Sequence, residues 1–470
     1  TATDITDWTP AQLASLPFFK RLNSPPSGPG VPASFSVAAR SASGFIAGQV
    51  PQGTPYAGNE ATLLVPAAGN GYTAAYTDPF GTYSWGYWSC DPRDCHYYFG
   101  YVRDSIARDV NFSGVMVGGA TVGGSGDHAS GASYHAYRYA AGVRVDIFPN
   151  AENAQAYAIN NRGEIAAYAY GAGSPNQGGI RRAPDGTVTV LDRIDGRAPL
   201  PRWINANGVI IGERYPSRAF ASSAGARAVD LPALGSFPTV TANDLTDTGW
   251  IVGKCGNFND PESFATIWEP NEHGTWTAHD LVEQLITPDI LLENALVIDN
   301  AGNIIATGHE DGNDNFGSRR YWLAPSAPLA GWCRPDIGIH PADTIAANGA
   351  AEFSITVVNA ADVTGYQWRL NGSTINPAQN ASATTAVLTL AGLSPADSGG
   401  VYDCIASSAC GDTTSASAVL IVEIACPADW DGSGGVDGDD IGAFFTDWQS
   451  GNADIDQSGG TDGDDITFFF

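Results

Sequence analysis

A short turn followed by an apolar run occurs six times within residues 1–330, and this repeat restricts the fold more than any other feature. Each copy starts at Asn, Asp or a small residue, passes through a turn that ends in glycine, and continues into a β-branched run. Glycine adopts the positive φ that such a turn needs, and the run after it is typical of a buried strand. The turn glycines are Gly44, Gly114, Gly163, Gly208, Gly249 and Gly302.

The spacing of the repeats predicts a four-stranded unit. A second pair of strands follows the apolar run, as in GTVTVLDRI. Four short strands in a period of about 40 to 50 residues are typical of a propeller blade. The sequence therefore predicts a mainly β chain in which residues 1–330 form a six-bladed β-propeller-like domain. Only RRYWLAP follows the last copy, so we expect its blade to take a strand from residues 1–35 or from a neighbouring chain.

The repeat also resembles a known family. INNRGEI and INANGVI, with the downstream HAY of His135–Tyr137 and RAF of Arg218–Phe220, are similar to HAF repeats. The resemblance covers about residues 30–325. It implies a propeller-like fold in a secreted bacterial protein, but it implies no activity.

The longest interval between repeats is rich in aromatic residues. Eleven of the residues Tyr72–Tyr101 are Phe, Trp or Tyr. They could form an exposed patch that stacks on sugar rings or on a partner protein, or they could pack inward in an enlarged blade. Cys90 and Cys95 flank Pro92, and we expect them to form a disulfide.

A change of pattern after the linker APSAPLAGWCRP predicts a second domain at residues 334–423. AEFSITV places Phe353, Ile355 and Val357 on one face of a strand. The segment resembles an immunoglobulin-like domain, which is a spacer or a binding module. The residues that match its core tryptophan and its tyrosine corner are Trp368, Asp397, Gly399, Tyr402 and Cys404.

This resemblance has one departure, which concerns the cysteines. The family's first cysteine is replaced by Ile355 or Val357, so the resemblance implies that the inter-sheet disulfide is absent. Cys404 could instead bond to Cys410. Seven cysteines without a CxxC pair indicate an oxidising, extracytoplasmic compartment, with buried thiols as the alternative. The pairing of Cys255, Cys333 and Cys426 stays open.

Two copies of an acidic loop lie near the C-terminus, ADWDGSGGVDGDDIGAFF and ADIDQSGGTDGDDITFFF. Counted from Asp429, side-chain oxygens fall at positions 1, 3, 5, 9 and 12, and a backbone carbonyl is available at position 7. This is the oxygen cage that Ca²⁺ prefers, and the mutual repulsion of the carboxylates should couple binding to folding. The expected ligands of two Ca²⁺ ions are Asp429, Asp431, Ser433, Gly435, Asp437 and Asp440, and Asp454, Asp456, Ser458, Gly460, Asp462 and Asp465.

The two loops resemble a dockerin across residues 427–470, because position 12 is Asp where an EF-hand has Glu. The resemblance implies a small α-helical, EF-hand-like domain that binds cohesins. Ile441, Phe444 and Phe445 would form the buried face of the first helix, and the second helix would be cut short at Phe470. A disordered acidic tail is the alternative.

The charge of the chain restricts its partners. Asp and Glu number 50 against 22 Lys and Arg, and the net charge of −28 excludes nucleic acid and suits divalent cations. No apolar run is long enough to span a membrane. A start at Thr1 without Met fits a processed export product. Asn111, Asn371 and Asn380 lie in N-x-S/T sequons, which we expect in exposed turns or strand ends and which are therefore candidate glycosylation sites.

These features together favour a non-enzymatic, secreted or cell-surface protein with a structural or adhesive role and a calcium-stabilised tail. Neither HExxH nor GxSxG is present. Self-assembly into a head-to-tail filament would satisfy the incomplete blade and the short second helix. A module that binds glycans or a cohesin-like protein is the alternative, and a propeller hydrolase is the third choice.

Overall fold

Most elements are β-strands, which confirms that the chain is mainly β. The computed structural model describes residues 2–4, 6, 32, 35–51, 59–67, 71–76, 83–90, 95–102, 105–122, 125–127, 133–171, 177–223, 227–257, 263–271, 274–285, 290–310, 319–329, 333–347, 349–358, 360–422, 430, 436–455 and 460–469. The chain divides into two compact units. The first comprises Thr1–His340, Ile355–Tyr366 and Ile405–Ala416, and the second comprises Pro341–Ser354, Gln367–Cys404 and Ser417–Phe470. The predicted domain boundaries stay predictions.

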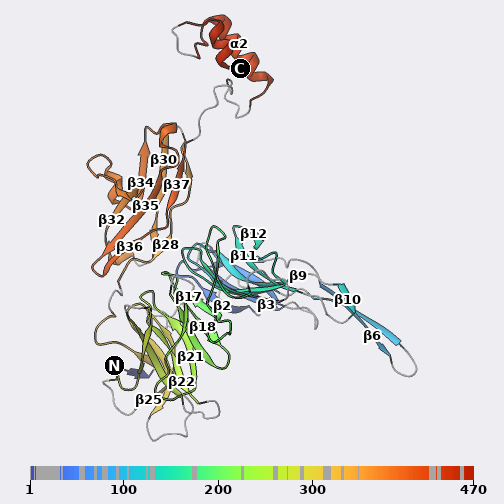
Figure 1. Cartoon of the computed structure of the whole chain (residues 1–470), viewed down its shortest axis with the longest axis vertical. Helices are drawn as coiled ribbons and strands as arrows, with labels where there is room; N and C mark the ends of the chain where they lie inside the picture. Colours follow the sequence, from blue (N-terminus) through green and yellow to red (C-terminus); the bar gives the residue numbers. More distant parts are fainter. Residues whose placement is uncertain are drawn as a thin grey trace. The chain divides into compact units, whose positions relative to one another are not determined.

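Each of the six repeats forms one four-stranded antiparallel sheet in the first unit (Figure 1). The first sheet contains β2 (Ser36–Arg40), β3 (Ile46–Pro51), β4 (Asn59–Ala67) and β5 (Gly71–Tyr76), and the second contains β8 (Ser105–Val110), β9 (Met116–Val122), β11 (Ser133–Ala140) and β12 (Val143–Asp146). The third contains β13 (Asn153–Ile159), β14 (Ile165–Tyr170), β15 (Gly178–Arg182) and β16 (Val188–Val190). The fourth contains β17 (Leu200–Ile204), β18 (Ile210–Arg214), β19 (Arg218–Ser222) and β20 (Ala228–Asp230).

The last two sheets follow the same plan. The fifth contains β21 (Thr239–Leu245), β22 (Ile251–Gly256), β23 (Ser263–Pro270) and β24 (Trp276–Asp280). The sixth contains β25 (Ile290–Ile298), β26 (Ile304–Glu310), β27 (Arg319–Leu323) and the N-terminal β1 (Ala2–Asp4). A separate sheet contains β6 (Tyr83–Cys90) and β7 (Cys95–Val102) from the first interval and β10 (Ser125–Asp127) from the second.

The sixth sheet is completed from within the chain. β1 pairs antiparallel with β27, with Ala2 opposite Leu323 and Asp4 opposite Tyr321. Asp4 also accepts a hydrogen bond from Arg319 at 2.7 Å. The prediction that residues 1–35 supply this strand is therefore confirmed.

The prediction of a six-bladed propeller is wrong. Consecutive sheets pack on one another, as β3 does on β8 and β22 on β25. Among the described residues, however, no strand of the sixth sheet packs closely on the first, and no closed propeller is seen. The repeat determines the four-stranded sheets and the contacts between consecutive sheets. These two features do not require the six sheets to close into a ring.

The strands β28 to β37 form further sheets in the segment for which the sequence predicts an immunoglobulin-like sandwich. The larger sheet has the order β29-β37-β35-β32-β33, with β36 also on β35, and two strand pairs, β28–β31 and β30–β34, accompany it. The bounds are β28 (Ile337–Ile339), β29 (Thr344–Ile345), β30 (Ala350–Ser354), β31 (Thr356–Val357), β32 (Val363–Leu370), β33 (Ser373–Thr374), β34 (Val387–Ala391), β35 (Val401–Ser408), β36 (Gly411–Thr414) and β37 (Ala418–Ile421). Short 3-10 turns are η3 (Ala360–Asp362), η4 (Ala381–Thr384) and η5 (Pro395–Asp397).

The residues predicted to form the core of this segment are buried in the second unit. Trp368 is fully buried, and its indole N–H donates to Thr385 O at 2.9 Å. The Phe353 and Tyr402 rings stack with centroids 4.7 Å apart. Asp397 accepts hydrogen bonds from the backbone and hydroxyl of Ser394, which holds the turn before β35.

The predicted α-helical domain at residues 427–470 is also corrected. Only two short helices are present in the part of this segment that is described, α2 (Gly438–Ser450) and α3 (Gly463–Phe469). The acidic loops before each helix take up most of the remaining residues, so little sequence is left for helix. Phe444 is buried as expected, but Ile441 is 39% exposed.

Candidate functional site

The six repeat turns share one hydrogen-bond pattern. The side chain of the first turn residue accepts a hydrogen bond from the backbone N–H four residues later, and the turn glycine has a positive φ between 77° and 97°. This local bond explains why Asn, Asp, Ser or Thr begins each turn. The pairs are Ser41 with Phe45 (3.0 Å), Asn111 with Val115 (2.9 Å), Asn160 with Glu164 (2.9 Å), Asn205 with Val209 (2.8 Å), Thr246 with Trp250 (3.0 Å) and Asp299 with Asn303 (2.8 Å).

Where the first residue is Asn, its amide also reaches the next turn. Asn111 Nδ2 donates to Asn160 O at 3.2 Å, and Asn160 Nδ2 donates to Asn205 O at 3.0 Å. Asn205 Nδ2 donates to Thr246 O at 2.8 Å. We call Asn111, Asn160, Asn205 and Thr246 the turn ladder. All four side chains are buried, so the ladder satisfies polar groups that would otherwise be costly to bury.

Sequence analysis missed a second glycine in the repeat. The strand before each turn carries a register shift just before the turn, for example between Ala107 and Asp109 in β8. Gly118 lies opposite this bulge, where an added Cβ would be 1.9 Å from Ile106 O. The G-x-x-x-G spacing in GFIAG, GVMVG, GVIIG and GWIVG was the available signal. Ala167 and Ala306 take this place in the other two repeats.

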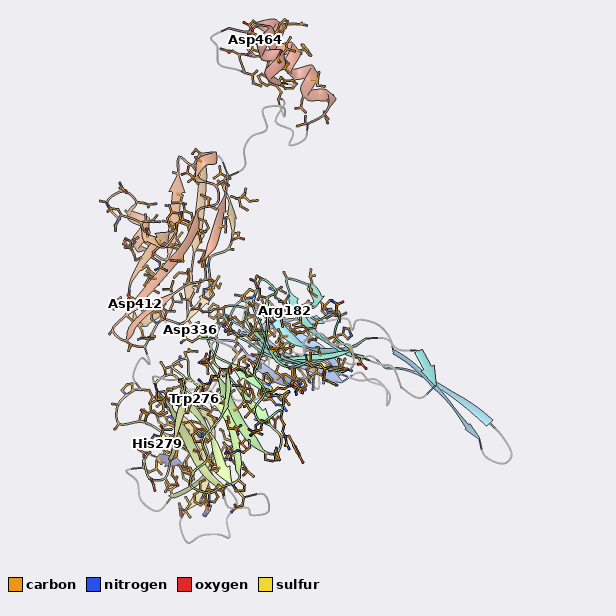
Figure 2. The ribbon with its side chains drawn as sticks, in the orientation of Figure 1. Arg182, Trp276, His279, Asp336, Asp412 and Asp464 are labelled. Atoms are coloured by element: carbon orange, nitrogen blue, oxygen red, sulfur yellow. A yellow bond between two sulfur atoms is a disulfide. The ribbon has the colours of Figure 1, made fainter. Side chains whose placement is uncertain are left out.

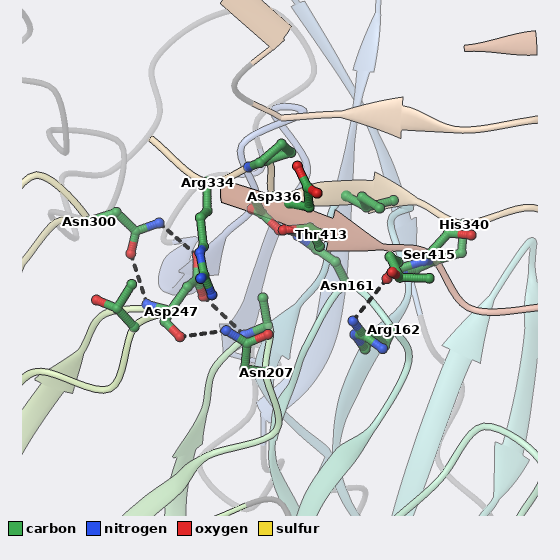
Figure 3. Close-up of a pocket in the computed structure, with 16 residues that line it drawn as sticks. Asn161, Arg162, Asn207, Asp247, Asn300, Arg334, Asp336, His340, Thr413 and Ser415 are labelled. Carbon is green, nitrogen blue, oxygen red and sulfur yellow. Dashed lines mark hydrogen bonds between the residues drawn. The ribbon is translucent and has the colours of Figure 1, made fainter. Parts of the chain in front are cut away.

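A polar cavity of about 300 Å³ lies beside the turn ladder, within the first unit (Figure 3). The second and third residues of three successive turns, with Asn300 of the next turn, form one side of it. Segments 334–337 and 412–415, together with His340, form the other side. Two contacts join the sides: Asn161 Nδ2 donates to Asp336 at 3.3 Å, and Arg162 donates to Thr414 O at 3.2 Å.

His340 is held neutral beside this cavity. Its Nδ1 accepts the Ala416 N–H at 2.9 Å, which places the ring proton on Nε2. Burial, and secondarily the positive charge of Arg162, lower the pKa of His340 to about 4. The Nε2 atom is buried and has no hydrogen-bond partner among the described residues.

The C-terminal segment repeats one carboxylate arrangement in both loops. The position-12 residue Asp440 accepts the Asp437 N–H at 2.7 Å, and Asp465 accepts the Asp462 N–H at 2.7 Å. Asp440 and Asp465 are fully buried. Asp465 also accepts the Ile455 N–H at 2.8 Å, so it connects the start of its loop to the end.

Aromatic packing brings the two halves of this segment together. The Phe444 and Phe469 rings stack with centroids 4.1 Å apart, and Trp430 meets Phe444 edge-on at 5.1 Å. Trp448 Nε1 donates to Asp462 O at 2.8 Å. Asp464, at the start of α3, is exposed (Figure 2). The two loops therefore belong to one small packed unit.

Calcium binding at these loops stays a prediction. In the described parts of the chain, no group of three or more His, Cys, Asp or Glu side chains is placed to hold a metal ion. The described residues of the predicted set are the acidic ones at positions 9 and 12 of both loops, with Asp454 and Gly460. The others lie outside the described residues: Asp429, Asp431, Ser433, Gly435, Asp456 and Ser458.

The predicted disulfide between Cys404 and Cys410 is wrong, because Cys410 bonds to Cys333. Cys404 lies in β35 with its side chain fully buried, whereas Cys410 lies in the turn after that strand. Burial raises the pKa of the Cys404 thiol to about 12. Cys90 and Cys95 lie opposite each other in the β6–β7 ladder, but their side chains, like the aromatic ones of these strands, lie outside the description.

The three sequons differ in exposure. Asn111 belongs to the turn ladder and is 5% exposed, so the expectation of an accessible site there is wrong. Asn380 caps η4, and its Nδ2 donates to Thr389 O at 2.8 Å. Asn371 is exposed, at a φ of 50° in the turn after β32. Asn371 is therefore the best placed of the three for modification.

Comparisons with known proteins identify no family for this chain. No family model matches it, and no curated protein matches it. The solved structures that it resembles include the Ig1-2 module of Drosophila receptor protein tyrosine phosphatase DLAR, at 12% identity and a TM-score of 0.19, over 39% of this chain and 97% of that one. Another is the insect immune protein hemolin, at 12% identity and a TM-score of 0.22, over 83% and 88%. At these scores the similarities carry no conclusion about function.

Proposed function

We propose that this chain is a non-enzymatic extracellular protein with a structural or adhesive role, and that its C-terminal segment binds two Ca²⁺ ions. The repeated carboxylate arrangement at Asp437–Asp440 and Asp462–Asp465 carries the proposal. Two loops with the same oxygen spacing and the same buried position-12 carboxylate are suited to hold the same hard cation. Bound calcium would supply positive charge that offsets the mutual repulsion of the loop carboxylates.

Two further observations support the location and the absence of catalysis. The disulfide between Cys333 and Cys410 is of the kind that persists in oxidising compartments. The Asn residues that gather at the repeat turns are used in the turn ladder, which is a structural role.

Neither helix in the described part of the chain has the length and apolar character needed to cross a bilayer.

Association with other protein chains is the finer part of the proposal. In the sixth sheet, β27 pairs with β1 of the same chain. This pairing removes one of the reasons to expect that another molecule donates a strand to that sheet. We therefore place the self-association in the calcium-loaded C-terminal segment and not at the sixth sheet. A cohesin-like partner for the same segment is the second candidate.

Light scattering and limited proteolysis of the full chain test this proposal. With calcium, we expect the C-terminal segment to resist proteolysis and the mass to rise with protein concentration. With a chelator, cleavage should begin near residues 423–436 while fragments of the first unit persist. Equal cleavage with and without calcium would contradict the calcium part, and a constant monomer mass would contradict the self-association.

A further inference from the structure

We propose that the cavity beside the turn ladder binds a small molecule that carries a carboxylate at one end and hydrogen-bond donors at the other, such as an acidic monosaccharide. This inference is independent of the calcium proposal, because it concerns other residues. The cavity of about 300 Å³ is at the lower end of the size range of ligand pockets, so it suits a single sugar-sized molecule.

One end of the cavity offers hydrogen-bond donors. Arg162 lines it and donates one hydrogen bond to Thr414 O, and no ion pair joins its guanidinium to a carboxylate among the described residues. His340 lies beside it with its unpartnered Nε2–H. In a chain with a net charge of −28, a half-buried guanidinium without an acidic partner is unexpected. A ligand carboxylate would satisfy both donors.

The opposite end offers the Asp247 carboxylate as an acceptor, and Arg334 also lines the cavity at this end (Figure 3). The Asp247 carboxylate accepts from the Ala206 N–H at 3.0 Å and from Asn300 Nδ2 at 2.6 Å (Figure 3). No cationic side chain of the described chain lies within ion-pair distance of this half-buried carboxylate. Asn207 and Thr248 line the same end and add amide and hydroxyl groups. Hydroxyl or ammonium donors of a ligand would fit here.

The protein positions both ends rigidly. Arg162 and Asp247 occupy the third position of one repeat turn and the second position of another, and the turn ladder connects those turns through Asn160, Asn205 and Thr246. Because the first turn residues fix the turns, the uncompensated charges are held apart and cannot neutralise each other. The ligand would therefore bridge two charges that the fold keeps separate.

The experiment is calorimetric titration of the full chain with D-glucuronate, its neutral counterpart D-glucose, and 4-aminobutanoate as a zwitterion without a sugar ring. We expect saturable binding of glucuronate and at least tenfold weaker binding of glucose. Arg162→Gln should weaken glucuronate binding by about tenfold or more, because it removes a charged donor. Arg162→Lys should retain most of it.

Arg193→Gln is the matched control, because Arg193 is exposed and is not part of the cavity. Stronger binding of 4-aminobutanoate than of glucuronate would support the two-ended chemistry and assign the zwitterion as the ligand type. Equal binding of glucose and glucuronate would overturn the proposal. So would the absence of saturable binding of all three probes, or equal effects of Arg162→Gln and Arg193→Gln.

Discussion

Replacing Asn160 with alanine tests the turn ladder. Asn160 is 5% exposed, and its side chain makes three hydrogen bonds: from Nδ2 to Asn205 O at 3.0 Å, from Nδ2 to Glu164 Oε2 at 2.7 Å, and at Oδ1 from the Glu164 N–H at 2.9 Å. Alanine leaves the Glu164 N–H without this acceptor, whereas the Asn205 carbonyl keeps its hydrogen bond from the Gly208 N–H at 3.0 Å. An unsatisfied buried polar group costs about 1 to 3 kcal/mol, so the substitution should destabilise the first unit by about 2 kcal/mol.

Asn271 provides the matched control. It begins the β23–β24 turn and accepts the Thr275 N–H at 3.1 Å, as Asn160 does in its own turn, but it is exposed. Water can replace its bonds, so Asn271→Ala should cost less than about 1 kcal/mol.

Urea unfolding, together with hydrogen exchange of the 160–164 and 205–209 peptides, measures both variants. The exchange of the 205–209 peptide should rise in Asn160→Ala only, because that peptide is in the next turn. Equal destabilisation by the two variants, with no exchange change at 205–209, would refute the ladder.

Three further predictions follow from other contacts. Removal of the Cys333–Cys410 disulfide, which has a sequence separation of 77, should lower the free energy of unfolding by about 4 kcal/mol; non-reducing peptide mapping that finds another pairing would contradict it. Because the pKa of His340 is lowered to about 4 in the fold, from 6.5, the unfolded chain binds the proton first, and stability should fall as pH drops from 6.5 to 4, by up to about 3 kcal/mol. The His340→Gln variant should lose this part of the pH dependence, and an unchanged pH profile would count against the assignment. Gly118→Ala should destabilise by about 3 kcal/mol, since its Cβ would lie 1.9 Å from Ile106 O, whereas Gly365→Ala, with no atom within 4 Å, should be close to neutral in the same denaturation assay.

The local structure of the repeats could be predicted from the sequence. Turn glycines such as Gly163 and Gly208 indicate a positive φ, and the apolar run after each indicates a buried strand, so the four-stranded units follow from neighbouring residues. Ring closure could not be predicted in the same way. It depends on packing between the first sheet and the sixth sheet. The last strand of the first sheet ends at Tyr76, and strand β25 of the sixth sheet begins at Ile290. No local pattern encodes a contact between segments so distant in the sequence.

The cysteine pairing shows a second limit. Cys404 and Cys410 are near in sequence, but strand alternation in β35 turns Cys404 into the core, and the segment before β28 brings Cys333 to the turn at Cys410. The cavity was missed for a related reason. Arg162 and Asp247 lie in the third and fifth repeat turns, and only the ladder that connects those turns places them around one space.

Calorimetric titration of the metal-free full chain with Ca²⁺ measures how many ions the C-terminal segment binds. We expect two Ca²⁺ ions per chain, one fewer in Asp465→Asn, and no change in Asp195→Asn, where the substituted carboxylate is exposed in the first unit. A wild-type chain that takes up no Ca²⁺, or an Asp465→Asn variant that still binds two ions with unchanged affinity, would contradict it.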